Sequence, residues 1–404
     1  MPELRPFSGL RYASADRLGD LLCPPYDVIS AEERERLYDL DPHNAIHLEL
    51  PRGDDEERYE RAGSAFEEWA RDGVLKSDDR PSLYVYRQDF TAPDGSRRRV
   101  AGVIGALELE AFGATSGVLP HERTMPGPKK DRLALMKALP ANVSPIFAIY
   151  RGEGGVAPFY DSLENRPPDA RVADRDGILH RLWVVKAPAE VAMLSDAIRP
   201  GPLVIADGHH RYETALAFRD ERPGNDASSA IMCFCVDADV EELVVLPYHR
   251  GLRGVGVDLE QALHASGGRE LSAGEVDGFL AGASGHPFVF VLPGATLGVE
   301  VSYELVERRL AGRAEAWRAL DVVVLHEVVL ADVLSDGAEE MTFTKDPDEV
   351  VRLVREEGWD AGVLLRGLHP AEVVDVARSG ERMPQKASYF WPKAVTGLVF
   401  RPTR

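Results

Sequence analysis

A short apolar run meets an amphipathic one in the stretch Leu203-Val204-Ile205-Ala206-Asp207-Gly208-His209-His210-Arg211-Tyr212-Glu213-Thr214-Ala215. The apolar run predicts a buried strand, and the spacing of apolar side chains from Tyr212 onward predicts a helix. Gly208 permits a tight reversal between them, because glycine adopts positive φ without a steric penalty. The stretch therefore predicts a strand–turn–helix unit, which is a building block of α/β folds.

The turn of this unit concentrates polar side chains. The first turn of a helix has N–H groups without intrahelical partners and the positive end of the helix dipole, so it favours an anion. We therefore predict Gly208, His209 and Arg211 as phosphate contacts, with Arg211 offering a fork suited to phosphate oxygens. Asp207 and His210 are candidate catalytic residues, and Asp207 lies where a Mg²⁺ ligand or general base is expected. In the alternative interpretation, Asp207 caps the helix and the histidines are a surface pair.

The same alternation of strands and helices continues through the centre of the chain. We expect helices at 30–40 and 55–72, a β-hairpin at 83–109, strands at 144–150 and 182–186, a helix at 189–198, and strands at 229–236 and 243–246. This pattern predicts a mixed α/β fold with helices flanking a mixed sheet. We predict two domains, an α/β core over 1–250 and a further α/β region over 251–404 that contributes a basic and aromatic segment to the site.

Composition narrows the class of protein. The chain has 404 residues, 44% of them hydrophobic, which is enough for a sizeable core. A net charge of -20 argues against general binding to nucleic acid or to an anionic membrane, but it leaves room for a small anion in a local basic pocket. No run approaches the roughly 20 apolar residues of a transmembrane helix, and three cysteines are too few for a disulfide framework. We expect a cytoplasmic protein, and a homo-oligomer is compatible with the sequence.

A second candidate group lies in the segment 113–132, which is rich in glycine, proline and charge and is predicted to be a loop. His121, Glu122 and Thr124 suit proton transfer or substrate binding, with Glu122 the preferred general base, and Lys129 suits a phosphate. Long loops in compact domains are often functional, so this one is a candidate lid. The alternative is a solvated charged loop that leads into a helix.

Further candidates are spread along the chain. Lys386 lies in the segment 383–393, where lysines and aromatic residues alternate and could hold a nucleobase and a phosphate; the alternative is a strand whose aromatic side chains pack on the core. His249 and Arg250 follow a strand and could reach an anion, although such a pair is more often structural. Asp27 follows two prolines on a rigid loop, where it is a substrate contact or a helix cap.

Asn44 is a candidate substrate contact, with a turn-stabilising role at least as compatible with the sequence. Cys233 and Cys235 alternate within a predicted strand and are interpreted as buried small hydrophobic residues. His326-Glu327 lacks a second histidine four residues on, so it is no zincin motif. The sequence also lacks the local motifs of P-loop ATPases, Rossmann dehydrogenases and α/β-hydrolases.

Beyond these local patterns, the chain resembles a large bacterial and archaeal family that carries a set of motifs in the same order. The motifs here are Cys23-Pro24-Pro25-Tyr26-Asp27, Pro42-His43-Asn44, His121-Glu122-Arg123-Thr124, Asp207-Gly208-His209-His210-Arg211, Leu246-Pro247-Tyr248-His249-Arg250 and Met383-Pro384-Gln385-Lys386-Ala387-Ser388-Tyr389-Phe390-Trp391-Pro392-Lys393. The family tends to have Lys-Ser-Thr in the last motif, so a hydroxyl role at Ala387 does not carry over.

The turn at 207–211 also resembles that of the ParB/sulfiredoxin-like free serine kinases. This resemblance implies a ParB/sulfiredoxin-like core, nucleotide phosphates on the helix after the turn, and a carboxylate that activates the substrate hydroxyl. It implies a kinase that uses ATP or ADP with Mg²⁺ on a small metabolite, with free L-serine favoured by analogy. The alternatives are a phosphatase or hydrolase of a phosphorylated metabolite and a non-catalytic nucleotide-binding regulator.

Overall fold

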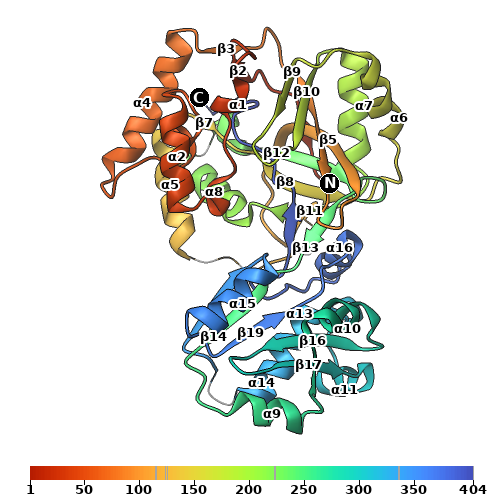
Figure 1. Ribbon diagram of the computed structural model, residues 1–404. Coiled ribbons are helices and arrows are strands. Elements are labelled where there is room, and N and C mark those ends of the chain that lie inside the picture. The colour runs from red at the N-terminus through yellow and green to blue at the C-terminus, as the bar shows by residue number, and fades with distance from the viewer. Residues whose placement is uncertain (114–115, 123, 125, 223, 335–336, 404) are drawn as a thin grey trace. The chain divides into compact units, whose positions relative to one another are not determined.

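A computed structural model describes residues 1–113, 116–122, 124, 126–222, 224–334 and 337–403 (Figure 1). The chain forms two compact units. The first comprises Met1–Pro120, Thr124–Leu243 and Pro392–Arg404, and the second comprises His121–Arg123 and Val244–Trp391. The domain boundary predicted from the sequence, at 250/251, stays a prediction.

The first unit alternates strands and helices as its sequence pattern predicts. Its elements are β1 (Leu4–Arg5), β2 (Leu10–Tyr12), α1 (Leu18–Leu21), α2 (Ala31–Leu40), α3 (Ile46–Glu49), α4 (Glu57–Arg71), β3 (Leu75–Ser77), β4 (Leu83–Thr91), β5 (Arg97–Glu108), β6 (Val118–Pro120), α5 (Pro126–Ala138), β7 (Ala141–Asn142), β8 (Ile146–Tyr150), α6 (Ala157–Ser162), β9 (Ala170–Ala173), β10 (Leu179–Val185), α7 (Pro188–Ile198), β11 (Leu203–Asp207), α8 (His209–Asp220), β12 (Ala230–Asp237) and β21 (Arg401–Pro402).

A large mixed sheet forms the centre of this unit. Its strand order is β6-β11-β8-β12-β5-β4-β10-β9, with β1 also paired to β5. The pairs β11–β6 and β12–β8 are parallel, and the pairs β11–β8, β12–β5, β4–β5, β10–β4 and β10–β9 are antiparallel. The predicted mixed α/β fold class is confirmed, and so is the predicted hairpin, which is β4 and β5.

Helices cover one face of this sheet through a continuous apolar core. Inward side chains of β11, such as Leu203 and Ile205, pack in the same cluster as Tyr212 and Ala215 of α8. Leu194 of α7 joins them, and α6 and α7 lie together at one end of the sheet (Figure 1). The helix that follows Gly208 is thus anchored by its apolar stripe, which leaves its first turn at the end of β11.

The segment 113–132 differs from the predicted loop. Val118–Pro120 forms β6, which pairs in parallel with β11, and α5 begins at Pro126. Proline is tolerated in the first turn of a helix, because the N–H group that it lacks would have no intrahelical partner there. The prolines that suggested a stiff loop therefore precede and begin a helix, and Lys129 lies on α5.

The second unit is built on an antiparallel sheet. Its elements are β13 (Val244–Leu246), β14 (His249–Arg253), α9 (Leu259–Ala265), β15 (Arg269–Glu270), α10 (Val276–Gly282), β16 (His286–Val291), β17 (Thr296–Val301), α11 (Tyr303–Arg309), α12 (Glu315–Arg318), α13 (Asp321–Val324), a π-helix (Leu325–Val329), α14 (Leu330–Val333), β18 (Glu340–Thr344), α15 (Pro347–Glu356), β19 (Ala361–Leu364), α16 (Pro370–Arg378) and β20 (Tyr389–Trp391). The strand order is β15-β17-β16-β19-β14-β18, and β13 pairs separately with β20.

Both faces of this second sheet are covered. Phe288 and Phe290 of β16 pack with residues of α13 and α14, whereas Val289 and Val291 pack with Val350 and its neighbours on α15. Successive side chains of a strand point to opposite faces, so the two clusters lie on opposite sides of β16. Within the described part of the chain, no helix is both long enough and apolar enough to cross a bilayer.

Candidate functional site

Gly208 makes the reversal between β11 and α8. Its φ is +89° and its ψ is 27°, a left-handed conformation that side-chain-bearing residues rarely adopt. A Cβ atom at this position would lie 2.8 Å from Cγ2 of Ile146 and 3.1 Å from Nε of Arg211. Gly208 is also the N-cap residue, so the alternative that Asp207 caps the helix is wrong. Glycine is required here for its φ and for the close approach of the Arg211 guanidinium.

Asp207 is held between two cations of the first unit. Arg211 Nη2 donates to Oδ2 of Asp207 at 2.6 Å, and the ammonium of Lys393 donates to Oδ1. The exposed fractions of the Asp207, Arg211 and Lys393 side chains are 12%, 9% and 10%. Burial alone would raise the pKa of Asp207, but Lys393 and Arg211 outweigh burial and hold it well below its usual value.

This pairing changes the chemistry expected of Asp207. A carboxylate with a strongly depressed pKa is a poor proton acceptor near neutral pH, so the candidate role of general base does not suit Asp207. Both of its oxygens already accept hydrogen bonds from cations. Asp207 in this arrangement does not suit the predicted role of Mg²⁺ ligand. A bound Mg²⁺ ion would lie next to the positive charges of the Arg211 guanidinium and the Lys393 ammonium, which would repel it.

Arg211 is also tied to the backbone beside the turn. Its Nη1 donates to Oγ of Ser144 at 2.9 Å and to the carbonyl oxygen of Pro145 at 2.8 Å. Ser144 in turn donates to Oε1 of Glu49 at 3.0 Å, and the Tyr26 N–H donates to the same oxygen at 3.1 Å. The guanidinium is thus fixed in one orientation, which is what a preorganised anion site needs.

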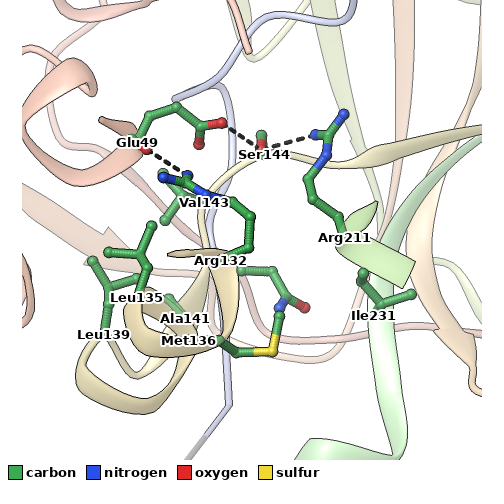
Figure 2. A pocket seen from close by; sticks show the side chains of 11 residues that line it. Glu49, Arg132, Leu135, Met136, Leu139, Ala141, Val143, Ser144, Arg211 and Ile231 are labelled. Carbon is green, nitrogen blue, oxygen red and sulfur yellow. Dashed lines mark hydrogen bonds between the residues drawn. The ribbon is translucent and has the colours of Figure 1, made fainter. Parts of the chain in front are cut away.

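A small cavity of about 50 Å³ lies beside this network (Figure 2). Figure 2 shows Ser144 between Arg211 and Glu49, with the two hydrogen bonds drawn as dashed lines. Arg132 lines the same cavity; its Nη1 donates to the Glu49 carbonyl oxygen at 2.7 Å, and its guanidinium lies 4.2 Å over the Tyr26 ring. The remaining lining residues are Leu135, Met136, Leu139, Ala141, Asn142, Val143 and Ile231.

The cavity brings two buried guanidinium groups to one place. Arg132 and Arg211 are 6% and 7% exposed. Nε of Arg211 is buried and has no hydrogen-bond partner among the described residues. A buried N–H donor without a partner is uncommon in folded proteins, so it marks a position where a further acceptor would bind. An anion with several oxygen acceptors suits this position.

The other predicted residues of the first unit divide into two groups. His209 is buried in the first turn of α8, and its charge is one of the influences that lower the pKa of Asp207. His210, in the same turn, is half-buried. Asp27 is exposed in a short 3₁₀ helix, Tyr26–Val28, and its charge helps to raise the pKa of Arg211 against the effect of burial. These residues gather around the turn.

Three other predicted contacts are engaged elsewhere. Thr124 Oγ1 and the Lys129 ammonium both donate to Oε2 of Glu213, at 2.7 and 2.8 Å. Asn44 is fully buried; its amide donates to the carbonyl oxygens of Asp20 and Leu22 and accepts the Ile46 N–H. The structure thus gives Asn44 the hydrogen bonds of a turn-stabilising residue, and its role as a substrate contact stays a prediction.

The remaining predicted residues lie in the second unit. Oε1 of Glu122 accepts the Lys386 N–H at 3.0 Å, and Nη2 of Arg250 donates to the Lys386 carbonyl oxygen at 3.1 Å. His121 is fully buried, with Nε2 2.9 Å from Oγ of Ser388. Nδ1 of His249 accepts the Leu365 N–H at 3.2 Å. Within this unit, residues from three separate sequence motifs therefore come together around Lys386.

Sequence reasoning missed several members of the first cluster. Lys393 stands in the same segment as the predicted Lys386, but only the fold shows that its ammonium reaches Asp207. Arg132, Glu49 and Ser144 carry no local signal, because each is an ordinary polar residue until the fold places it beside Arg211. Among the residues that the structure describes, no group of three or more His, Cys, Asp or Glu side chains could hold a metal ion.

Comparison with known families assigns the chain to one of them. A family model described as "Protein of unknown function (DUF1015)" matches residues 4–323, which is most of the chain. The protein therefore belongs to this family, as the order of its motifs led us to expect. No curated protein matches the chain significantly.

Several solved structures resemble the fold distantly. "Free serine kinase in complex with AMP" is 12% identical with a TM-score of 0.36, over 68% of this chain and 83% of the other. "SbnI with C-terminal truncation from Staphylococcus aureus" is 10% identical with a TM-score of 0.40, over 74% and 87%. A conserved hypothetical protein from Pyrococcus furiosus is 13% identical with a TM-score of 0.35, over 69% and 89%.

Proposed function

We propose that this protein is a nucleotide-dependent phosphotransferase that phosphorylates the hydroxyl group of a small metabolite. ATP or ADP is the donor, and free L-serine is the favoured substrate because the turn at 207–211 resembles that of the free serine kinases. The turn between β11 and α8 binds phosphate groups of the nucleotide. Mg²⁺ enters this proposal with the nucleotide, since nucleotide phosphates and water supply most of the ligands of that ion in such sites.

One observation carries the proposal: a glycine at positive φ begins α8, and a buried, oriented arginine packs against it. The first turn of α8 offers backbone N–H groups and the positive end of the helix dipole. Arg211 adds a fixed guanidinium whose Nε has no partner among the described residues, and Lys393 adds a second cation beside Asp207. Phosphoryl transfer depends mainly on such positioning and on positive charge near the phosphates.

The other assignments stay predictions. Glu122 is the preferred general base, and Lys386, His249 and Arg250 are candidate phosphate contacts. His121 and Asp27 are candidate substrate contacts, and His210 is a further candidate catalytic residue. Thr124 and Lys129 fit these roles less well, since both side chains already contact Glu213.

The assay incubates the full chain with Mg²⁺, L-serine and either ATP or ADP, and detects phosphoserine by mass spectrometry. We expect product with at least one nucleotide. Arg211→Met should lower kcat/KM by about 100-fold or more, the usual effect of removing one preorganised donor to transition-state charge. Arg219→Met is the matched control, because Arg219 lies at the other end of the same helix and contacts the Leu109 carbonyl oxygen and Asp220.

Two further measurements separate the competing functions. Phosphate release from phosphoserine without nucleotide would favour a phosphatase, whereas nucleotide binding by calorimetry without any turnover would favour a regulator. Absence of product with every nucleotide, together with absence of nucleotide binding, would overturn the proposal. Product formation that survives Arg211→Met unchanged would show that the turn at 207–211 is not where the phosphates bind.

A further inference from the structure

Arg250 is an unusual buried cation in the second unit. It lies on β14 and is 0% exposed. By volume, it is the largest of the fully buried residues in the described part of the chain. Its guanidinium donates to the carbonyl oxygens of Tyr248 and Lys386 and lies 5.3 Å over the Phe343 ring. Within the described part of the chain, it forms no ion pair with a carboxylate, and its Nε has no hydrogen-bond partner.

Such a charge is costly. Carbonyl dipoles and one aromatic face stabilise a cation only partly, so a buried charge without a counter-ion destabilises the fold. Burial accordingly lowers the pKa of Arg250 to about 9, with Glu122 acting in the other direction. Strongly perturbed pKa values cluster at functional sites, and at such a site a ligand can supply the missing charge.

The pKa values of two histidines, His249 and His326, are lowered by burial and by the positive charge of Arg250. Burial, reinforced by the charge of Arg250, lowers the pKa of His249 and of His326 to about 4. Both imidazoles are therefore neutral near pH 7, and they can donate or accept hydrogen bonds without adding charge. Nε2 of His326 is buried and has no partner among the described residues. A second buried polar atom, on a residue whose pKa the charge of Arg250 helps to lower, thus also lacks a partner among the described residues.

The backbone is irregular at both His326 and Lys386. His326 lies in the π-helix Leu325–Val329, a rare conformation that is often found at functional sites. Lys386 has a φ of +53°, in the left-handed region that non-glycine residues rarely adopt. Glu122 accepts the Lys386 N–H at 3.0 Å and so helps to hold this turn, and the Lys386 ammonium lies 5.2 Å over the Tyr248 ring.

We propose that Arg250, His326 and Lys386 form an oxyanion-binding site inside the second unit, which takes the phosphate or carboxylate group of a small molecule. The Nε–H of Arg250 and the imidazole of His326 supply hydrogen bonds, and Lys386 supplies further charge. This proposal takes Arg250 and Lys386 out of the set of candidate nucleotide-phosphate contacts and assigns them to a separate anion site, which is tested without the phosphotransferase reaction.

Calorimetry on the full chain tests this site. The protein is first saturated with ADP, which fills the turn at 207–211 according to the proposed function, and is then titrated with inorganic phosphate and, separately, with acetate. We expect binding of at least one of these anions, and the stronger of the two identifies the ligand group. Arg250→Met and His326→Leu should each weaken that binding at least tenfold, and Arg250→Lys should lie between them and the wild-type protein.

The matched control is Arg253→Met, an arginine on the same strand whose side chain is 44% exposed. We expect it to bind the anion like the wild-type protein. Wild-type affinity in both Arg250→Met and His326→Leu, or no binding of either anion by the folded wild-type protein, would overturn the proposal. Should Arg250→Met not fold, Arg250→Lys and His326→Leu still decide. If the protein does not bind ADP but still binds the anion, the proposed phosphotransferase function is contradicted and the anion site is not.

Discussion

Two buried arginines, Arg211 and Arg250, solve the same electrostatic problem in different ways. Arg211 lies against Asp207, and neighbouring carboxylates raise its pKa although burial opposes them. Arg250 is still more deeply buried, and the partners of its guanidinium among the described residues are carbonyl oxygens and an aromatic ring. Its pKa is lowered to about 9. The charge of Arg211 is balanced by carboxylates of the protein itself. The charge of Arg250 is left for the proposed anion to balance.

This contrast separates a cluster whose charges are paired within the protein from the buried cation of the proposed anion site. A buried ion pair is broken at high cost when one partner is removed, because the other charge stays buried. A buried charge without a partner is already destabilising, so its removal costs little. Substitutions at the two arginines and their neighbours should therefore have different effects on stability, and the predictions below run from the largest effect to the smallest.

Asp207→Asn should have the largest effect. It leaves Arg211 and Lys393 facing each other across a neutral amide, so we expect a loss of about 3–5 kcal/mol in the free energy of unfolding. Urea denaturation followed by circular dichroism measures it. Asp220→Asn, which removes an exposed carboxylate at the other end of α8, should change the midpoint little. Equal midpoints for Asp207→Asn and the wild-type protein would mean that this cluster is not balanced as described.

The pH dependence of the same variant sharpens the test. The folded pKa of Asp207 is depressed, so its contribution to stability is present above the unfolded value of about 3.9 and is lost as the pH falls below it. The stability difference between the wild-type protein and Asp207→Asn should thus be constant near neutral pH and should shrink under acid conditions.

The two arginines can also be compared directly by truncation. Arg211→Met leaves Asp207 buried with Lys393 alone and should cost about 3 kcal/mol. Arg250→Met removes a costly charge and loses hydrogen bonds to two carbonyl oxygens, so the two effects nearly offset and the net change should stay within about 1 kcal/mol. Thermal midpoints of the two variants decide. A larger loss for Arg250→Met than for Arg211→Met would reverse the contrast drawn above.

Glu241 extends the comparison to a half-buried acid. Burial raises its pKa from 4.5 to about 7 while it accepts the Ala101 N–H at 2.7 Å. A raised folded pKa means that the contribution of Glu241 to stability is complete below pH 4.5 and is lost as the pH rises through 7. Glu241→Gln keeps the acceptor without the charge, so at pH 8 it should stabilise the protein by roughly 2 kcal/mol. The gain should vanish at pH 4.5, and a gain independent of pH would contradict this cause.

Local sequence patterns could predict one part of this contrast and not the other. The apolar run ending at Asp207, the glycine and the amphipathic helix are all consecutive, so the turn and the place of Arg211 followed from them. Lys393 lies 186 residues from Asp207 in the chain, and no periodicity relates the two. The sequence around His326 lacks the zincin spacing and so gives no signal. His326 becomes a candidate only through the π-helix that contains it and through the charge of Arg250, which helps to lower its pKa.

The same limit explains the errors in segment 113–132. Its prolines and charges are typical of a loop, and the parallel pairing of β6 with β11 is a tertiary contact that short strands acquire from their neighbours. Asn44 and Lys129 were chosen for their chemistry, but the fold uses them for a turn and for an ion pair with Glu213. Residue type indicates what a side chain can do, and only the packing decides which partner it meets.

Gly208→Ala tests how the first arginine is positioned, through a difference of only about 1 kcal/mol from its matched control. Gly95, in the hairpin turn, shares a positive φ of +80°, but a Cβ there would meet nothing within 4 Å among the described residues. Gly95→Ala should thus cost only the backbone term of about 1–2 kcal/mol. Gly208→Ala should cost about 1 kcal/mol more, because its Cβ would lie 2.8 Å from Ile146 Cγ2 and 3.1 Å from Arg211 Nε. If urea midpoints show equal losses, crowding at Arg211 is absent; if Gly208→Ala alone also weakens nucleotide binding, the glycine sets the position of the guanidinium that meets the phosphates.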